Sequence, residues 1–156
     1  MPITYCILHT SMQPNDRTRK FIIATHGTLA AGVKSSLDII IGEMENVFLV
    51  QAYVDENSSV EEELKAILKQ VDDNEDLVIF SDILGGSVTN QMLQHALRPN
   101  VYIVSGFNLP LVIEIILSDT GTPLNEIIEE SIANAKEQMV FVNKLLTAEN
   151  KEDQDD

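Results

Sequence analysis

From residue 21 onward, short apolar runs alternate with longer segments whose apolar residues recur at helical spacing. The short runs lie at residues 21–25, 47–52, 77–81 and 101–104 and are rich in β-branched and aromatic side chains. Strands that are apolar at nearly every position are typical of parallel sheets, because such strands are buried on both faces. The alternation therefore predicts an α/β domain with a parallel sheet and right-handed crossovers.

Residues that start or stop helices stand at the ends of the intervening segments. Ser59 opens a capping box, and Ser87 is suited to capping the next helix. Pro110 and Pro123 suit first helical turns, and Gly42 suits a left-handed helix stop. These signals predict helices over 29–41, 88–97, 109–117 and 124–138. A further helix follows Ser59 and has its apolar face between residues 64 and 71.

The two ends of the chain fall outside this alternation. Residues 1–20 combine a turn sequence with a charged approach to the first strand, so we expect an N-terminal extension outside the core. Half of residues 147–156 are acidic, and we expect a disordered tail there. The folded domain then spans 21–146. Within it, residues 139–145 break the helical period and are β-branched and aromatic, which predicts a late strand.

Charge and composition narrow the function classes. The formal net charge of −15 argues against binding to nucleic acid, whose phosphates would be repelled. This acidity either belongs to solvated surfaces or steers a basic partner to the protein. Cys6 is the one cysteine, no apolar leader opens the chain, and the apolar runs are too short to span a membrane. We therefore expect a cytoplasmic protein.

Candidate chemistry lies where two of the predicted strands end. His26 ends the first strand and Asp82 ends the third. In an open, doubly wound sheet with the flavodoxin-like strand order 2-1-3-4, these two carboxyl ends are neighbours at the topological switch point. Asp82 would accept a hydrogen bond from one ring nitrogen of His26, which leaves the other nitrogen as a nucleophile. The same carboxylate would stabilise a positive charge that develops on the ring.

The turns around this point suit a small phosphoryl group. Gly85 and Gly86 allow close approach of an anion, Ser87 follows them, and Gly106 and Asn108 lie beyond the fourth strand. These turns contain no Lys or Arg, which argues against a nucleoside triphosphate and for a transiently held group. No Cys/His cluster has the spacing of metal ligands, so we expect neither a metal nor a cofactor.

Other interpretations of these residues remain open. A histidine at a strand end is often structural, and a Gly-Gly pair is a weak signal on its own. A receiver domain phosphorylated on Asp82 would share the fold, but Thr25-His26-Gly27 provides none of the acidic residues that hold magnesium in receivers. A regulatory module of the same fold that only binds a ligand is a third interpretation, and it leaves the placement of His26 without a role.

Three motifs together resemble a known family, the enzyme IIA component of the mannose-class (mannose/fructose/sorbose) bacterial sugar phosphotransferase system. They are Ala24-Thr25-His26-Gly27, the segment Asp82-Ile-Leu-Gly85-Gly86-Ser87-Val-Thr-Asn90, and Ser105-Gly106-Phe-Asn108-Leu-Pro110. The resemblance implies a phosphotransferase in which His26 is phosphorylated by the phosphocarrier protein HPr. The phosphoryl group then passes to a histidine of enzyme IIB and onward to sugar that enters through membrane permease subunits.

The resemblance also implies roles for individual residues and an assembly. Asp82 would orient His26, while the phosphoryl group would lie among a set of small and polar residues: Thr25, Gly27, Gly85, Gly86, Ser87 and Asn108. The family is typically a homodimer whose late antiparallel strand is exchanged between subunits, and residues 139–145 fit that strand. Residues 1–20 depart from the family pattern, and no IIB domain follows residue 156, so we expect a free-standing IIA. The related phosphotransfer subunit of dihydroxyacetone kinase is the alternative within this fold.

Overall fold

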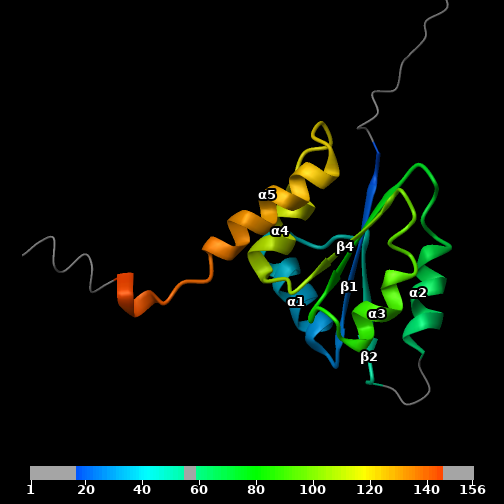
Figure 1. Cartoon of the computed structure of the whole chain (residues 1–156), viewed down its shortest axis with the longest axis horizontal. Coiled ribbons are helices and arrows are strands. Elements are labelled where there is room, and N and C mark those ends of the chain that lie inside the picture. Colours follow the sequence, from blue (N-terminus) through cyan, green and yellow to red (C-terminus); the bar gives the residue numbers. More distant parts are fainter. Residues whose placement is uncertain (1–16, 55–58, 146–156) are drawn as a thin grey trace, which may run out of the picture.

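The computed structural model of the protein describes residues 17–54 and 59–145. Four strands form a single sheet: β1 (Arg19–His26), β2 (Val47–Ala52), β3 (Asp76–Ser81) and β4 (Val101–Ser105). All neighbouring strands are parallel, and their order is β2-β1-β3-β4 (Figure 1). The predicted α/β fold and the 2-1-3-4 strand order are thereby confirmed. The first strand begins at Arg19, two residues before the predicted start.

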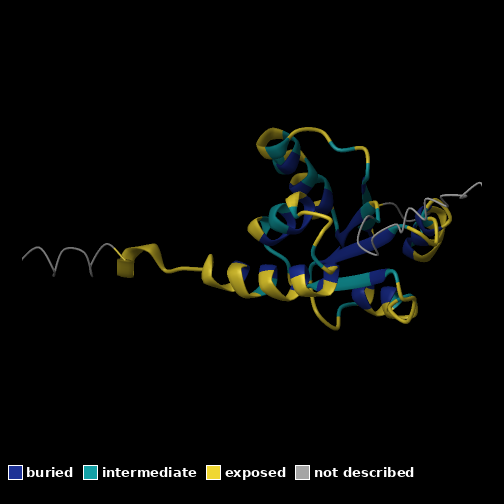
Figure 2. Cartoon of the chain, turned by 90° about the horizontal axis from the view of Figure 1, so that it is seen from above, coloured by how far each residue is buried: buried dark blue, intermediate teal, exposed yellow. Residues whose placement is uncertain are grey.

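Five helices among the described residues cover the two faces of the sheet. They are α1 (Leu29–Ile41), α2 (Val60–Leu68), α3 (Ser87–Leu93), α4 (Leu109–Leu117) and α5 (Leu124–Glu137). Helices α1, α4 and α5 contribute to one apolar cluster, and helices α2 and α3 contribute to the other. Figure 2 shows this layering, with the buried strands between helices that turn their exposed sides outward.

The alternation of side chains along β1 divides the core between these two clusters. Phe21 and Ile23 belong to the cluster with α1, α4 and α5, whereas Ile22 and Ala24 belong to the cluster with α2 and α3. All four side chains are almost completely buried, as is every residue of β3. Strands that are buried on both faces in this way hold a fixed register, because a shift of one residue would exchange the two faces.

The helix ends follow the predicted signals in part. Ser59 accepts a hydrogen bond from the backbone N–H of Glu62, and Pro110 lies in the first turn of α4. Gly42 has a positive φ of 90° with an extended ψ of 166°, so it does not adopt the left-handed helical conformation that we predicted. Ser87 lies inside α3 rather than capping it, and Gly86 takes the cap position.

Two predicted segments differ in the structure. Helix α3 ends at Leu93 rather than at residue 97, because the chain turns there toward Pro99 and the start of β4. Residues 139–145 form no strand: residues 142–145 make one helical turn on an arm that projects beyond α5 (Figure 1). Among residues 17–54 and 59–145, no strand lies beside residues 139–145 to exchange hydrogen bonds with them. Most of the expected extension, residues 1–16, and the expected tail at 147–156 lie outside the described residues.

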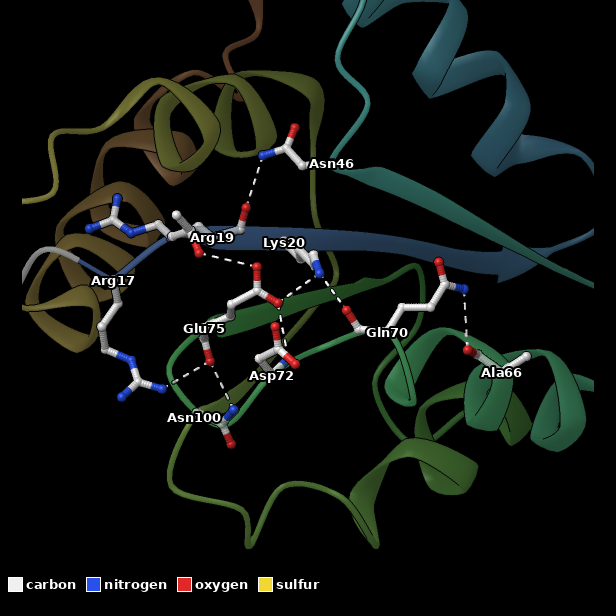
Figure 3. Close-up of polar contacts among 10 residues, drawn as sticks. Arg17, Arg19, Lys20, Asn46, Ala66, Gln70, Asp72, Glu75 and Asn100 are labelled. Carbon is white, nitrogen blue, oxygen red and sulfur yellow. Dashed lines mark hydrogen bonds and ion pairs between the residues drawn. The ribbon is translucent and has the colours of Figure 1, made fainter.

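A polar network ties the beginning of β1 to the turn before β3 (Figure 3). The Lys20 ammonium donates to the Glu75 carboxylate at 2.6 Å and to the backbone carbonyl of Gln70. The same carboxylate accepts from the backbone N–H of Asp72 at 2.9 Å and from the hydroxyl of Thr18 at 3.1 Å. These bonds, first those from Lys20 and Asp72, outweigh the cost of partial burial and lower the pKa of Glu75.

Replacement of Glu75 by Gln should reduce stability in a pH-dependent way. Because the pKa of Glu75 is lower in the folded than in the unfolded state, its stabilisation is complete above the ordinary value of 4.5 and is lost as the pH falls through the lowered value. We expect Glu75→Gln to lower the free energy of unfolding by about 1–3 kcal/mol at neutral pH. Denaturant unfolding across the pH range measures the difference from wild type.

The matched control is Glu129→Gln, at an exposed position on α5. This change removes the same charge outside the network and should leave the unfolding free energy nearly unchanged. A difference between Glu75→Gln and wild type that persists undiminished in acid would show that the carboxylate charge is not what stabilises the network.

Candidate functional site

The carboxyl ends of β1, β2 and β3 lie side by side at one end of the sheet. His26 is the last residue of β1 and pairs in register with Ala52, the last residue of β2. On the other side of β1, Ala24 is in register with Ser81, so Asp82 follows directly beside the end of β1. The topology thus brings together His26 and Asp82, as the sequence predicts, and adds the residue that follows β2, Tyr53.

One oxygen of Asp82 holds both the ring and the backbone of His26. Oδ2 accepts from the backbone N–H of His26 at 2.9 Å and lies 2.9 Å from Nδ1 of the same residue. The other oxygen, Oδ1, accepts from the backbone N–H of Ile83 at 2.9 Å. The two bonds to Oδ2 fix the imidazole relative to the sheet, because they restrain its main chain and its side chain together.

The ionised form of Asp82 is favoured by these contacts. Partial burial alone would favour the neutral acid, but the hydrogen bonds from the backbone and ring of His26 and from Ile83 outweigh it and lower the pKa of Asp82. An ionised carboxylate only accepts hydrogen bonds, so Nδ1 carries the proton in this pair. In the neutral imidazole, Nε2 then carries the lone pair, which can accept a hydrogen bond or act as a nucleophile.

A hydroxyl pair lies on the side of Nε2. Ser87 Oγ is 3.2 Å from Nε2 of His26, and the Tyr53 hydroxyl donates to Ser87 Oγ at 2.8 Å. The rings of Tyr53 and His26 are stacked, with centroids 5.8 Å apart and an angle of 25° between their planes. Tyr53 is not among the site residues predicted from the sequence. Its position directly after β2, at the carboxyl edge of the neighbouring strand, was the signal that could have identified it.

The turn after β3 passes close to the imidazole at Gly86. A Cβ on Gly86 would lie 3.2 Å from Cε1 of His26 and 3.2 Å from the carbonyl oxygen of Ile83, so a side chain there would require these neighbours to move by a few tenths of an ångström. The backbone N–H of Gly86 donates to the same carbonyl of Ile83 at 3.2 Å. Gly85 has a φ of 76° and Gly27 a φ of 58°, conformations that other residues rarely adopt.

Two of the predicted phosphoryl-binding residues have hydrogen bonds to the scaffold. Thr25 is completely buried, and its hydroxyl accepts from the backbone N–H of Ala30 at the start of α1. Asn108 caps α4: its side-chain oxygen accepts from the N–H of Leu111, and its amide donates to the carbonyl of Ala135 on α5. Thr25 therefore joins the end of β1 to α1, and Asn108 joins α4 to α5.

The described part of the chain contains neither a metal-binding cluster nor a membrane-spanning helix. Across residues 17–54 and 59–145, no three His, Cys, Asp or Glu side chains gather in a way that suits a metal ion. Within the same ranges, none of the helices combines the length and the apolar character needed to cross a bilayer. The polar side chains that do gather at the carboxyl edge of the sheet are those of His26, Asp82, Ser87 and Tyr53.

The fold and this site define a class: an open α/β domain that presents an imidazole, oriented by a carboxylate, at its topological switch point. Residues 20–132 match the sequence model of the EIIA-man family, described as the fructose IIA component of the phosphotransferase system (PTS). Because the match covers most of the chain, the protein belongs to this family.

Individual relatives agree with this assignment. The chain is 24% identical over 123 residues to the PTS mannose-specific EIIAB component of Escherichia coli K12. This match covers 77% of this chain and 38% of that protein. The chain thus spans 38% of the length of this curated relative.

Solved structures show the same architecture. A PTS permease crystal structure from Klebsiella pneumoniae, described there as putative, is 30% identical with a TM-score of 0.78, over 83% of this chain and 95% of that one. The mannose/sorbose-specific IIA subunit from Enterococcus faecalis is 25% identical with a TM-score of 0.67, over 79% and 93% of the two chains. These relatives are described as components of sugar phosphotransferase systems.

Proposed function

We propose that this protein is a phosphoryl carrier that accepts a phosphoryl group from HPr on Nε2 of His26 and donates it to enzyme IIB for sugar uptake. The observation that carries the proposal is the position of His26, with Nδ1 bonded to Asp82 and Nε2 beside the Ser87 hydroxyl. This arrangement leaves one nitrogen with a proton and a partner, and turns the other toward a small polar donor. Family membership supports the same assignment.

The transfer is an in-line displacement at phosphorus. The lone pair of Nε2 forms a bond to phosphorus while the bond between phosphorus and the donor's leaving atom breaks, and its electron pair stays with the donor. The proton on Nδ1 does not move, so the imidazole becomes positively charged as the bond forms. Ionised Asp82, 2.9 Å from Nδ1, stabilises that charge. Donation to enzyme IIB runs through the same steps in reverse.

Ser87 provides a neutral hydrogen-bond donor beside Nε2, the nitrogen that accepts the phosphoryl group in this proposal. Its hydroxyl lies 3.2 Å from Nε2 and is placed to turn from the ring nitrogen to an oxygen of the arriving phosphoryl group. Gly86 keeps the space beside Cε1 open for that arrival. We place the reaction in the cytoplasm, as expected from the sequence, and include the homodimer of the family in the proposal.

Phosphorylation of His26 is tested directly. Incubation with the general phosphotransferase proteins, HPr and labelled phosphoenolpyruvate should label the protein, and the label should be stable in base and labile in acid. His26→Ala should abolish labelling. His95→Gln is the matched control, because it changes the other histidine of the described chain, beyond the end of α3, and should leave labelling unchanged. Labelling that survives His26→Ala, or an acyl phosphate on Asp82, contradicts the histidine assignment.

The contribution of Asp82 is tested by Asp82→Asn. This change keeps the shape of the side chain but removes the charge that stabilises the developing imidazolium. We expect transfer from HPr to slow by about one to three orders of magnitude, within the range of positioned acid–base groups. Stopped-flow or rapid-quench transfer assays measure the rate, and circular dichroism confirms the fold. A wild-type rate would show that Asp82 serves only the turn.

The proposed homodimer rests on the apolar arm. In the described chain β4 has β3 as its one neighbour, so its other edge is unpaired. The arm carries five large apolar side chains that are each at least half exposed: Met139, Val140, Phe141, Val142 and Leu145. An unpaired sheet edge and an exposed apolar segment each favour association with another chain. Exchange of the arms between two subunits, each arm pairing with the other subunit's sheet, would cover both.

Sedimentation of two truncated chains tests this assembly. Removal of residues 139–156 should release monomers at micromolar concentration, because the chain then lacks the exchanged segment. Removal of residues 146–156 alone is the matched control and should leave the dimer intact. A full-length protein that sediments as a monomer, or a chain without the arm that remains dimeric, rules out the exchange of arms.

A further inference from the structure

Tyr53 has a strained backbone at the edge of the site. Its φ is 66°, and of the described residues it is the one non-glycine with a positive φ. A bulky side chain in this conformation is strained, because its Cβ approaches the following carbonyl. Such strain persists where the surroundings impose it, and it clusters at functional sites.

Burial does not account for the strained conformation. The Tyr53 residue is 67% exposed, so the apolar area that its ring removes from water is small. Its specific contacts are both directed at the site: the ring stacks on His26, and the hydroxyl donates to Ser87 Oγ at 2.8 Å. The positive φ therefore bends the chain after β2 so that the side chain reaches these two residues.

The direction of each hydrogen bond in the chain of contacts can be deduced. Ionised Asp82 only accepts, so Nδ1 of His26 carries the proton and Nε2 of the neutral ring only accepts. Ser87 must then donate its hydroxyl proton to Nε2, which leaves the Ser87 lone pairs to accept from Tyr53. The result is a relay in which Tyr53 donates to Ser87 and Ser87 donates to the nucleophilic lone pair. Hydrogen bonds in such a chain strengthen one another.

We propose that Tyr53 is a positioning residue for phosphoryl transfer. It holds Ser87 Oγ in place while the Ser87 hydroxyl redirects its hydrogen bond from Nε2 to an oxygen of the arriving phosphoryl group. This inference rests on the proposed function of His26. Nε2 cannot attack phosphorus while its lone pair accepts the Ser87 proton, so that bond must be exchanged in the transfer step. The Tyr53 bond to Ser87 Oγ is compatible with both arrangements, because it uses a lone pair and not the proton of Ser87. Tyr53 thus keeps Oγ in place while the serine proton turns.

The test is Tyr53→Phe, which keeps the ring and removes the hydroxyl. We expect transfer from HPr to slow by roughly two- to tenfold, the effect of one neutral hydrogen bond on a barrier. Tyr102→Phe is the matched control. Tyr102 lies on β4 and lines a pocket with Arg17 and Asp76, at the amino ends of the strands, and its change should leave the rate unaltered.

Two further measurements separate positioning from a structural role. In the unphosphorylated protein at alkaline pH, the ¹⁵N resonance of Nε2 should shift in Tyr53→Phe toward the value of an imidazole with a weaker hydrogen bond, while that of Nδ1 stays in place. In a Ser87→Ala background, Tyr53→Phe should have no additional effect on the rate, because Tyr53 acts through Ser87.

The possible outcomes distinguish this inference from the proposed function. A wild-type protein that is not labelled on His26 overturns both. If His26 is labelled but Tyr53→Phe transfers at the wild-type rate with an unchanged Nε2 resonance, the role of Tyr53 alone is overturned. Equal slowing by Tyr53→Phe in the wild-type background and in the Ser87→Ala background also overturns it, since the effect would not pass through Ser87.

Discussion

The hydrogen bonds from His26 to one oxygen of Asp82 are the interaction on which the rest of the site depends. Oδ2 accepts from both the backbone and the ring of His26, each at 2.9 Å. This double contact determines which ring nitrogen keeps the proton, and it favours the ionised form of Asp82. From that assignment follow the nucleophilic role that we propose for Nε2 and the directions of the two neighbouring hydrogen bonds. Ser87 donates to Nε2, and Tyr53 donates to Ser87 Oγ.

Such a contact requires that β1 and β3 keep their register to within a fraction of a residue. Polar contacts restrain this pair of strands at both ends. At the amino end Lys20 donates to Glu75 at 2.6 Å, and at the carboxyl end His26 donates to Asp82. Between them, side chains buried on both faces prevent the strands from sliding. The network at the amino ends of the strands therefore supports the geometry of the site, although the site lies at their carboxyl ends.

The sequence predicts those parts of the structure that depend on local pattern. Short apolar runs identified four strands, and the placement of His26 and Asp82 followed from the strand order. Tyr53 was not predicted, because its position directly after β2 is a weak signal and a positive φ at a tyrosine contradicts the intrinsic preference of that residue. The predicted cap Ser87 lies one position inside α3, a shift of one residue that turns its hydroxyl to His26. Residues 139–145 have the composition of a strand, but strand formation depends on a pairing partner that no single-chain pattern supplies.

The charges at the site are suited to brief residence of the phosphoryl group. The contacts to both ring nitrogens of His26 come from Asp82 and Ser87, so in the described residues neither of these partners is a cation. Asp82 stabilises the positive ring of the proposed phosphohistidine but repels the negative phosphoryl oxygens, while the hydroxyl of Ser87 offers a weaker, neutral bond. A site with Lys or Arg at these positions would bind the anion more tightly and slow its departure. For the proposed carrier, this set of contacts favours formation of the phosphohistidine without making it a stable end point, so that the group is donated as readily as it is accepted.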